Sequence, residues 1–237
     1  MYDIKQIILN ETLNKPKYTS VTIGENTVID GEVRIFYSSL DLPNGYFKVN
    51  NKSDKRISYI LDRVNHRTEK DPKTGLTKWA VKAYNFTSEQ YTYEWWINGV
   101  RKRIDKHPNG VSYPNVVNEQ GTQMWRNERG NQHRDEKDPN TGLSLPSYIT
   151  TDGYCVWEID NKNHRIDGPA VSYDKRYTPS YNKWERERYD KYYLDDKELS
   201  KEEWEKDPRV QRVLALKAVE DTKTSDDDFL RSFGKIV

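Results

Sequence analysis

An internal repeat constrains the fold of this chain more than any other feature of its sequence. Residues 66–76 read HRTEKDPKTGL and residues 133–143 read HRDEKDPNTGL, so nine of eleven positions are identical. Aromatic residues introduce related segments at intervals of 30 to 36 residues, at Tyr59, Trp95, Trp125, Trp157 and Tyr192. A repeat of this length indicates small structural units that bury their apolar faces only by stacking on one another.

Each unit is predicted to be a β-hairpin or a three-stranded meander. Residues 154–173 show the pattern most clearly, because strand-like alternation precedes and follows the turn-rich segment 160–163. Asn98-Gly99 is the dipeptide most typical of a two-residue hairpin turn. The sequence therefore predicts a mainly β fold, in which an array of about five such units spans residues 56–199.

The segments on either side of the array are expected to cap it. Residues 1–55 show alternation and turns, which predicts an N-terminal β-rich cap. From Ser200 the pattern becomes helical, because Ser200 and Glu203 match a capping box and Asp207 precedes a proline. Residues 200–237 are therefore predicted to form a C-terminal helical cap. Its apolar residues expected to pack on the array are Leu214, Phe229, Leu230 and Phe233.

The segment at residues 157–170 resembles the aromatic-x-x-(N/D)-G-x-x-H-R-x-D-G-P-A repeat of proteins from tailed bacteriophages and large DNA viruses. These proteins are loosely akin to MORN-type hairpin repeats. His164-Arg165 and Asp167-Gly168-Pro169-Ala170 carry the likeness, whereas the units introduced by Tyr59, Trp95 and Trp125 keep the arginine and lose Gly-Pro-Ala. The resemblance covers roughly residues 56–199 and implies a viral protein with a β-rich array. It implies no particular activity.

Composition narrows the classes of protein to which the chain can belong. It carries 39 basic and 38 acidic residues, a balance that lacks the basic footprint of most nucleic-acid-binding proteins. Only 34% of the residues are hydrophobic, but 17 tyrosines and 7 tryptophans indicate a folded chain. The single cysteine, Cys155, excludes an internal disulfide and fits a reducing compartment, and no apolar run is long enough to cross a membrane. The expected location is the host cytoplasm or the virion.

Histidines and arginines recur at fixed positions of the repeat, and we interpret them as structural. A metal site or a catalytic base is the alternative for the histidines, but Lys102 replaces the histidine of the second unit. The arginines could bind phosphate, but acidic residues one or two positions later are expected to neutralise them. No catalytic residue, metal or cofactor is therefore predicted. The structural positions are Tyr59, His66, Arg67, Trp95, Arg103, Trp125, His133, Arg134, Trp157, His164, Arg165 and Asp167.

Four residues are predicted to contact a partner: Trp96, Arg101, Tyr181 and Trp184. Trp96 follows the core position Trp95 and is expected to point outward, while Tyr181 and Trp184 lie in a charged aromatic insertion over residues 174–191. Aromatic residues and arginine are the types enriched at binding hot spots.

The sequence therefore predicts a non-enzymatic viral protein that binds a macromolecule, most plausibly another protein. It would be either a structural component of the virion or a factor that engages a host protein. The second interpretation is an RNA or nucleotide binder that uses exposed aromatic residues and the arginine row. The third is an enzyme whose site is assembled from histidine and acidic residues between units.

Overall fold

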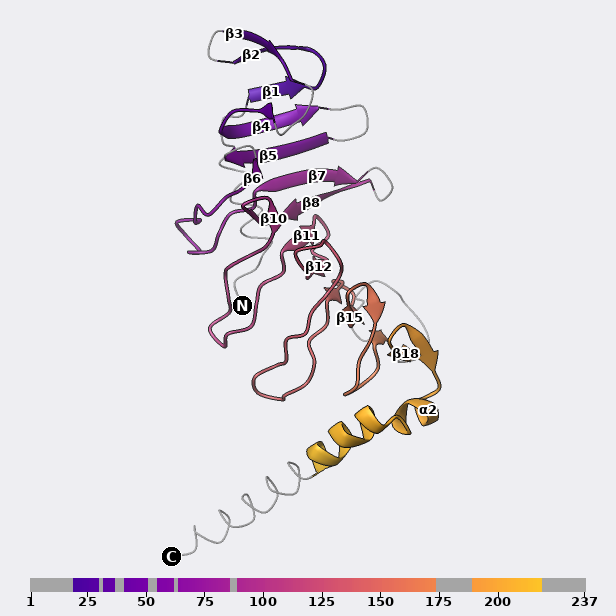
Figure 1. Ribbon diagram of the computed structural model, residues 1–237. Helices are drawn as coiled ribbons and strands as arrows, with labels where there is room; N and C mark the ends of the chain where they lie inside the picture. Colours follow the sequence, from indigo (N-terminus) through magenta and orange to yellow (C-terminus); the bar gives the residue numbers. More distant parts are fainter. Residues whose placement is uncertain are drawn as a thin grey trace, which may run out of the picture.

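The fold is an elongated stack of β-strands that ends in a helical segment. The computed structural model describes residues 19–29, 32–36, 41–50, 55–61, 64–85, 89–173 and 189–218. Figure 1 shows the strands stacked along one axis, from β2 (Asn26–Ile29) and β3 (Glu32–Ile35) at one end to helix α2 (Lys201–Glu205) at the other. The mainly β class predicted from the sequence is confirmed.

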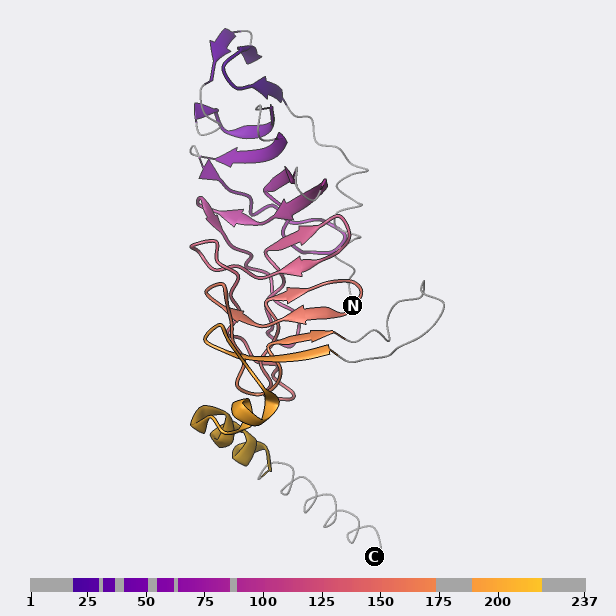
Figure 2. The ribbon, with the colours of Figure 1, turned by 90° about the vertical axis from the view of Figure 1, so that its right-hand side faces the viewer.

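Most strands belong to one long sheet. In the order of the sheet they are β1 (Thr19–Thr22), β4 (Gly45–Asn50), β5 (Lys55–Leu61), β7 (Val81–Asn85), β8 (Gln90–Glu94), β11 (Val116–Asn118), β12 (Gln123–Met124), β13 (Tyr148–Ile149), β14 (Tyr154–Val156), β17 (Val171–Tyr173), β18 (Tyr189–Leu194) and β19 (Lys197–Leu199). The short strand β6 (Val64–Asn65) pairs with β5 beside this path. Strands β1 and β4 are parallel, and the later neighbours are antiparallel. Figure 2 shows the strands from β11 to β18 stacked one below another.

Separate two-stranded hairpins leave the long sheet between its strands. They are formed by β9 (Trp96–Ile97) with β10 (Val100–Arg101) and by β15 (Glu158–Ile159) with β16 (Lys162–Asn163). Their turns begin with Asn98 at φ 51° and Asp160 at φ 54°, and the β18–β19 turn begins with Asp195 at φ 53°. A second left-handed residue follows in each turn, which is the type I′ geometry that matches the twist of paired strands. The hairpin predicted at Asn98-Gly99 is confirmed.

Apolar side chains gather in three separate clusters along the axis. The N-terminal cluster contains Val21, Ile29, Phe36, Leu42, Phe47, Val49 and Ile60. The middle cluster contains Trp79, Tyr93, Trp95 and Val117, and the C-terminal cluster contains Leu194, Trp204 and Val210. Small clusters of this kind explain how a chain with so few hydrophobic residues folds, because its large aromatic rings bury much area each.

The helical segment covers the end of the stack. Ser200 and Glu203 form the predicted capping box at the start of α2, and a second helical stretch covers residues 208–218 of the described chain. Trp204 and Val210, exposed by 3% and 0%, pack on Leu194 of the last long strand. The prediction that Leu214 is buried is wrong: it is 38% exposed. The inner side of this helical stretch is formed by Val210 and the partly buried Val213, and Leu214 lies on its exposed side. Phe229, Leu230 and Phe233 lie outside the described residues.

The predicted insertion over residues 174–191 is shorter than expected at its C-terminal end. Residues 189–191 begin strand β18 and pair with β17. The high density of charge in this stretch concealed the strand, because the adjacent charged residues Asp190 and Lys191 interrupt the alternation of polar and apolar residues by which a strand is recognised. The long sheet also crosses the boundary drawn between residues 55 and 56, since β4 and β5 pair over six residues.

Candidate functional site

The four repeat arginines lie buried against aromatic rings. The exposed fractions are 5% for Arg67, 8% for Arg103, 7% for Arg134 and 9% for Arg165. The guanidinium carbons of Arg103, Arg134 and Arg165 lie 4.2, 3.9 and 3.9 Å from the ring centres of Trp95, Trp125 and Trp157. Each arginine also donates an Nη1 hydrogen to a backbone carbonyl, of Trp79, Pro114, Pro146 and Pro169 in turn. The arginine row is therefore used inside the fold, and a phosphate cannot reach it without opening these contacts.

Successive segments are joined by one arrangement of contacts that occurs three times. The Trp95 indole N–H donates to the Thr77 carbonyl at 2.7 Å, and the Asp105 carboxylate accepts the Thr77 amide at 3.0 Å together with its hydroxyl. Trp125 and Glu136 hold Ser112 in the same way, and Trp157 and Asp167 hold Ser144. We call each arrangement an indole–carboxylate link. Two side chains thus fix both polar backbone groups of one serine or threonine from the preceding segment.

The carboxylate of each link also neutralises the arginine two residues before it. Arg165 Nε donates to Asp167 at 2.6 Å, and Arg103 Nε donates to Asp105 at 2.9 Å. Burial alone would raise the pKa of Asp167, but hydrogen bonds from Ser144 and the charge of Arg165 hold that pKa below its ordinary value. The predicted local neutralisation matches this geometry for Arg103 with Asp105 and for Arg165 with Asp167, whereas Arg134 pairs with Glu136 and not with the expected Asp135.

Gly168 leaves the space that the Arg165 guanidinium occupies. A Cβ atom at Gly168 would lie 2.9 Å from Arg165 Cζ and 3.0 Å from its Nη1. We expect Gly168→Ala to lower the free energy of unfolding by about 1–3 kcal/mol, because the guanidinium must move off Trp157 or out of its ion pair. Urea denaturation of the two proteins measures this difference. An unchanged midpoint and slope would show that Arg165 has room to shift.

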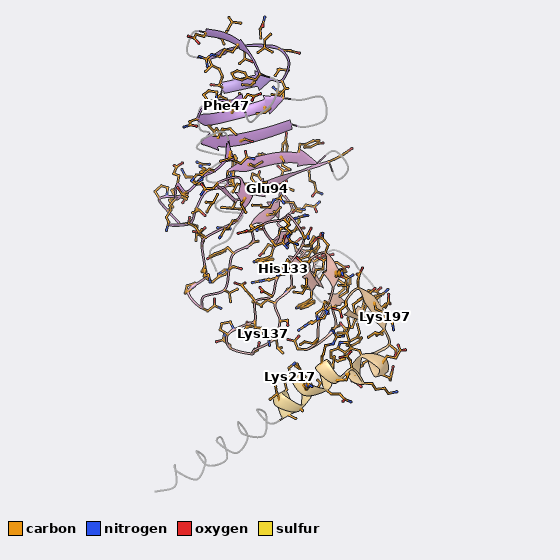
Figure 3. All side chains as sticks on the ribbon, in the orientation of Figure 1. Phe47, Glu94, His133, Lys137, Lys197 and Lys217 are labelled. Atoms are coloured by element: carbon orange, nitrogen blue, oxygen red, sulfur yellow. The ribbon has the colours of Figure 1, made fainter. Side chains whose placement is uncertain are left out.

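The repeat histidines hold the turn of the following hairpin. His133 Nδ1 accepts the backbone N–H of Asp160 at 3.3 Å, and His164 Nδ1 accepts that of Asp195 at 3.1 Å. His66 makes the equivalent contact with Asn98 at 3.0 Å. The same Nδ1 atoms lie 2.7, 3.2 and 2.9 Å from the side-chain oxygens of Asn98, Asp160 and Asp195, so each ring contacts two polar groups of one turn residue. The interpretation that they act within the repeat fits these contacts. Figure 3 shows His133 in the middle of the stack.

The tryptophans predicted as core residues differ in burial. Trp125 is 7% exposed, whereas Trp157 is only partly buried and uses its indole N–H in a link. Trp96 is also partly buried: its indole N–H donates to Glu94 at 2.8 Å, and Arg101 stacks on its ring at 4.8 Å. Arg101 Nε also reaches Glu94, at 3.2 Å. Trp96 and Arg101 therefore partner each other, and their contact with another molecule stays a prediction. Tyr181 and Trp184 lie outside the described residues.

Two kinds of reactive group were sought in the part of the chain that the structure describes: clusters of metal ligands and a reactive thiol. No group of three or more His, Cys, Asp or Glu side chains lies close enough there to hold a metal ion. Burial raises the pKa of the Cys155 thiol, which keeps it protonated near neutral pH. No helix in the described residues is long and apolar enough to cross a membrane.

A small pocket of about 270 Å³ lies among the arginines, between Arg103, Trp125, Arg126 and Arg134. Its cations are matched by carboxylates of the same segments, because Arg103 pairs with Asp105 and Arg134 pairs with Glu136. Burial and the nearby Arg101 lower the pKa of Arg126, and Glu94 and Glu158 act in the opposite direction. Arg126 itself donates to the Gly130 carbonyl, so the lining of the pocket includes two ion-paired arginines and a third that bonds to the backbone.

One face of the long sheet carries partly exposed polar and aromatic side chains, with the charged residues Glu94 and Lys191 among them. Residues directly opposite one another in antiparallel strands project from the same face. Thr92 faces Asn118, Met124 faces Tyr148, and Tyr154, Tyr173 and Tyr189 face one another across β14, β17 and β18. We call this side the open face and define it by Gln90, Thr92, Asn118, Met124, Tyr148, Thr150, Tyr154, Tyr173 and Tyr189.

Four tyrosines form a row along the open face. Tyr148, Tyr154, Tyr173 and Tyr189 lie on four successive strands of the sheet, β13, β14, β17 and β18. The ring centres of Tyr148 and Tyr154 are 6.3 Å apart, and those of Tyr154 and Tyr173 are 6.2 Å apart. Tyr189 is 48% exposed. We call this set the tyrosine row.

A groove of about 550 Å³ adjoins the tyrosine row on the open face. Gln90, Thr92, Asn118, Tyr148, Thr150 and Asp152 line it, with Met124 in its floor. Asn118 donates to the Gln90 side-chain oxygen at 3.0 Å and accepts the Thr122 amide at 2.8 Å. The Tyr173 hydroxyl donates to Asp152 at 3.4 Å, which connects the groove to the row. The groove is therefore held in shape by its own hydrogen bonds.

Sequence reasoning did not find the open face. The available signal was the spacing of two between a tyrosine and a second partly exposed residue, as in Tyr148 and Thr150. The strands concerned are only two or three residues long, so alternation over one step does not distinguish a strand from a loop. Comparison of the chain with family models, with curated proteins and with solved structures found no match.

Proposed function

We propose that this chain is a non-enzymatic binding protein that docks a protein partner on its open face. The observation that carries the proposal is the tyrosine row, four rings on successive strands, with Lys191 over the ring of Tyr189 at one end. Tyrosine supplies a large contact area at a small cost in side-chain entropy, and it is enriched at the centres of protein interfaces. A row of such rings suits a partner surface better than a small metabolite.

The proposed scaffold is an array of hairpin units between the two caps. The three indole–carboxylate links and the three histidine contacts occur at matching sequence positions, which supports one repeated unit. Stacked units present a long surface whose strands each contribute one or two side chains. In this proposal the links provide rigidity, and the open face provides recognition.

The docking proposal also includes Tyr181 and Trp184, the two residues of the insertion that the sequence predicts to contact a partner. Residues 174–188, which contain Tyr181 and Trp184, connect Tyr173 to Tyr189 along the chain. Both ends of this segment therefore attach to members of the tyrosine row. The resemblance to viral repeats further leads us to propose a viral source, with the host cytoplasm or the virion as the place of action.

A capture experiment with matched variants tests the docking proposal. The full chain, Tyr189→Ser and Ile104→Ser are each used to capture proteins from host lysate, and mass spectrometry identifies what is retained. Tyr189 and Ile104 are similarly exposed, by 48% and 50%, so the loss of surface hydrophobicity is comparable. We expect Tyr189→Ser to weaken binding of the specific partner by about tenfold or more, and Ile104→Ser to leave it unchanged.

Equal capture by all three proteins would contradict docking on the row. Equal loss in both serine variants would also contradict it, since a nonspecific hydrophobic contact would then explain the capture. Turnover of a substrate by the purified full chain would contradict the non-enzymatic part of the proposal.

A further inference from the structure

The groove on the open face has a lining whose chemistry differs from that of the tyrosine row. Gln90, Thr92, Asn118 and Thr150 contribute amides and hydroxyls, and the charged group among the groove's lining residues is Asp152. Side chains of these types both donate and accept hydrogen bonds without carrying charge. The lining therefore matches a ligand that is rich in hydroxyl groups and has no net charge.

Several groups in the groove keep hydrogen-bonding capacity for a ligand. Because the Gln90 side-chain oxygen accepts from Asn118, the Gln90 amide nitrogen is oriented away from that bond and its hydrogens remain to be donated. Gln120 and Thr151 lie exposed at the rim. The Thr150 hydroxyl donates a hydrogen bond to the Asp152 carboxylate. This bond is the main reason why the pKa of Asp152 lies below its ordinary value. A carboxylate held ionised in this way can accept two hydroxyl hydrogens from a ligand.

Tyr148 supplies the aromatic surface that a sugar ring needs. The C–H face of a sugar ring is weakly positive and packs on the negative face of an aromatic ring. Tyr148 lines the groove and stands edge-on to Tyr154, with an angle of 79° between the rings. Tyr148 is only partly buried. The groove thus pairs one aromatic platform with a fixed set of amide and hydroxyl groups.

The size of the groove sets the length of the ligand. A volume of about 550 Å³ lies within the range of about 300–1,000 Å³ that is typical of ligand sites. The lining residues come from β8, β11, β12 and β13, and adjacent strands are about 4.8 Å apart, so the groove spans roughly 14 Å across the sheet. One monosaccharide would leave much of this length empty.

We infer that this groove binds a neutral oligosaccharide, with one sugar ring stacked on Tyr148 and neighbouring hydroxyls held by Gln90, Asn118 and Asp152. This site goes beyond the proposed docking of a protein, because it uses the groove and leaves Tyr154, Tyr173 and Tyr189 available to that partner. A saccharide site and a protein site then lie side by side on one face.

The inference is tested by titrating the full chain with maltohexaose, cellohexaose and chitohexaose as neutral probes and a hyaluronan hexamer as an acidic probe. Calorimetry and saturation-transfer NMR report binding. We expect at least one neutral probe to bind with a Kd below about 1 mM, and the acidic probe to bind at least about tenfold more weakly. Tyr148→Leu, which keeps an apolar side chain on the sheet, is expected to weaken neutral binding by about tenfold or more.

Two further variants separate this site from the docking surface and from unfolding. Tyr189→Leu is the matched control, because it removes a tyrosine of the same face outside the groove and should leave the saccharide Kd unchanged. Gln90→Ala removes an amide of the groove without changing an aromatic ring, and it should weaken the binding of the neutral probe. It keeps the inference testable if Tyr148→Leu unfolds the chain. Absence of binding by all three neutral probes, tighter binding of the acidic probe, or equal loss in Tyr189→Leu would each overturn the inference.

Discussion

Replacing Trp95 with alanine is expected to lower the free energy of unfolding by about 3–5 kcal/mol. Trp95 is 1% exposed and belongs to the cluster with Trp79, Tyr93 and Val117. Its removal creates a cavity, leaves the Thr77 carbonyl without its indole donor, and takes the aromatic ring away from Arg103. These three losses act on the same small cluster.

Trp96 provides the matched control for Trp95. It is the same residue type one position later, but it is partly exposed and bonded to Glu94 at the surface. We expect Trp96→Ala to cost less than about 1 kcal/mol. Chemical denaturation of the two variants and of the parent chain, followed by circular dichroism, gives both values. Similar losses for the two tryptophans would contradict the assignment of Trp95 as the buried anchor.

Asp167→Asn is expected to lower the free energy of unfolding by about 3–5 kcal/mol at neutral pH, because it leaves the buried Arg165 without its ionic partner. Asp167 also accepts the amide and hydroxyl hydrogens of Ser144, at 2.6 and 2.8 Å, and an asparagine oxygen satisfies these less strongly than a carboxylate. The third indole–carboxylate link is thereby weakened along with the ion pair. Denaturation at several pH values measures the loss.

The pH dependence gives a second readout for Asp167. Its folded-state pKa is lowered, so its contribution to stability is fully present above the unfolded-state value, about 3.9 for an aspartate, and disappears as the pH falls through the folded-state value. The parent chain should therefore lose its advantage over Asp167→Asn in this acidic range. A constant difference between the two proteins down to low pH would contradict the pairing.

Glu69 serves as the control for Asp167. It follows Arg67 at the same interval and bonds to it at 2.8 Å, but 54% of its side chain is exposed. Among the described residues, the Glu69 carboxylate bonds to Arg67 and to Lys78 of its own segment and to no serine or threonine of a preceding segment. We expect Glu69→Gln to lower the free energy of unfolding by less than Asp167→Asn does, because the Glu69 carboxylate is half-exposed and water screens its pairing with the buried Arg67.

The sequence predicted which tryptophans and arginines take part in the indole–carboxylate links. It did not predict the contacts that these links make with the preceding segment. Regular spacing identified Trp95 and Arg103 as members of one set, since Trp125 and Arg134 stand at the equivalent positions of the next unit. It did not identify Thr77, because serine and threonine are common in turns and nothing in the pattern assigns one of them a partner 18 residues away. Contacts between units depend on how the units stack, which the pattern within one unit does not contain.

The candidate site was missed for a related reason. The tyrosine row is created by the register between strands, in which Tyr154 faces Tyr173 and Tyr173 faces Tyr189. This register cannot be predicted from the sequence, because Tyr173 and Tyr189 are joined by a long connection and the length of a loop does not determine which residues pair. Trp96 and Arg101 were predicted to contact a partner because of their residue types. In the structure the Arg101 guanidinium stacks on the Trp96 ring.

The indole–carboxylate links also bear on how such a chain can change over generations. Each link engages only the segment before it, so duplication or loss of one segment leaves the contacts of the distant ones intact. The same event lengthens or shortens the open face by a pair of strands. Duplication or loss of segments can thus change the length of the recognition surface by one unit at a time. Substitutions at Tyr148 or Tyr189 change the chemistry of that surface at single positions.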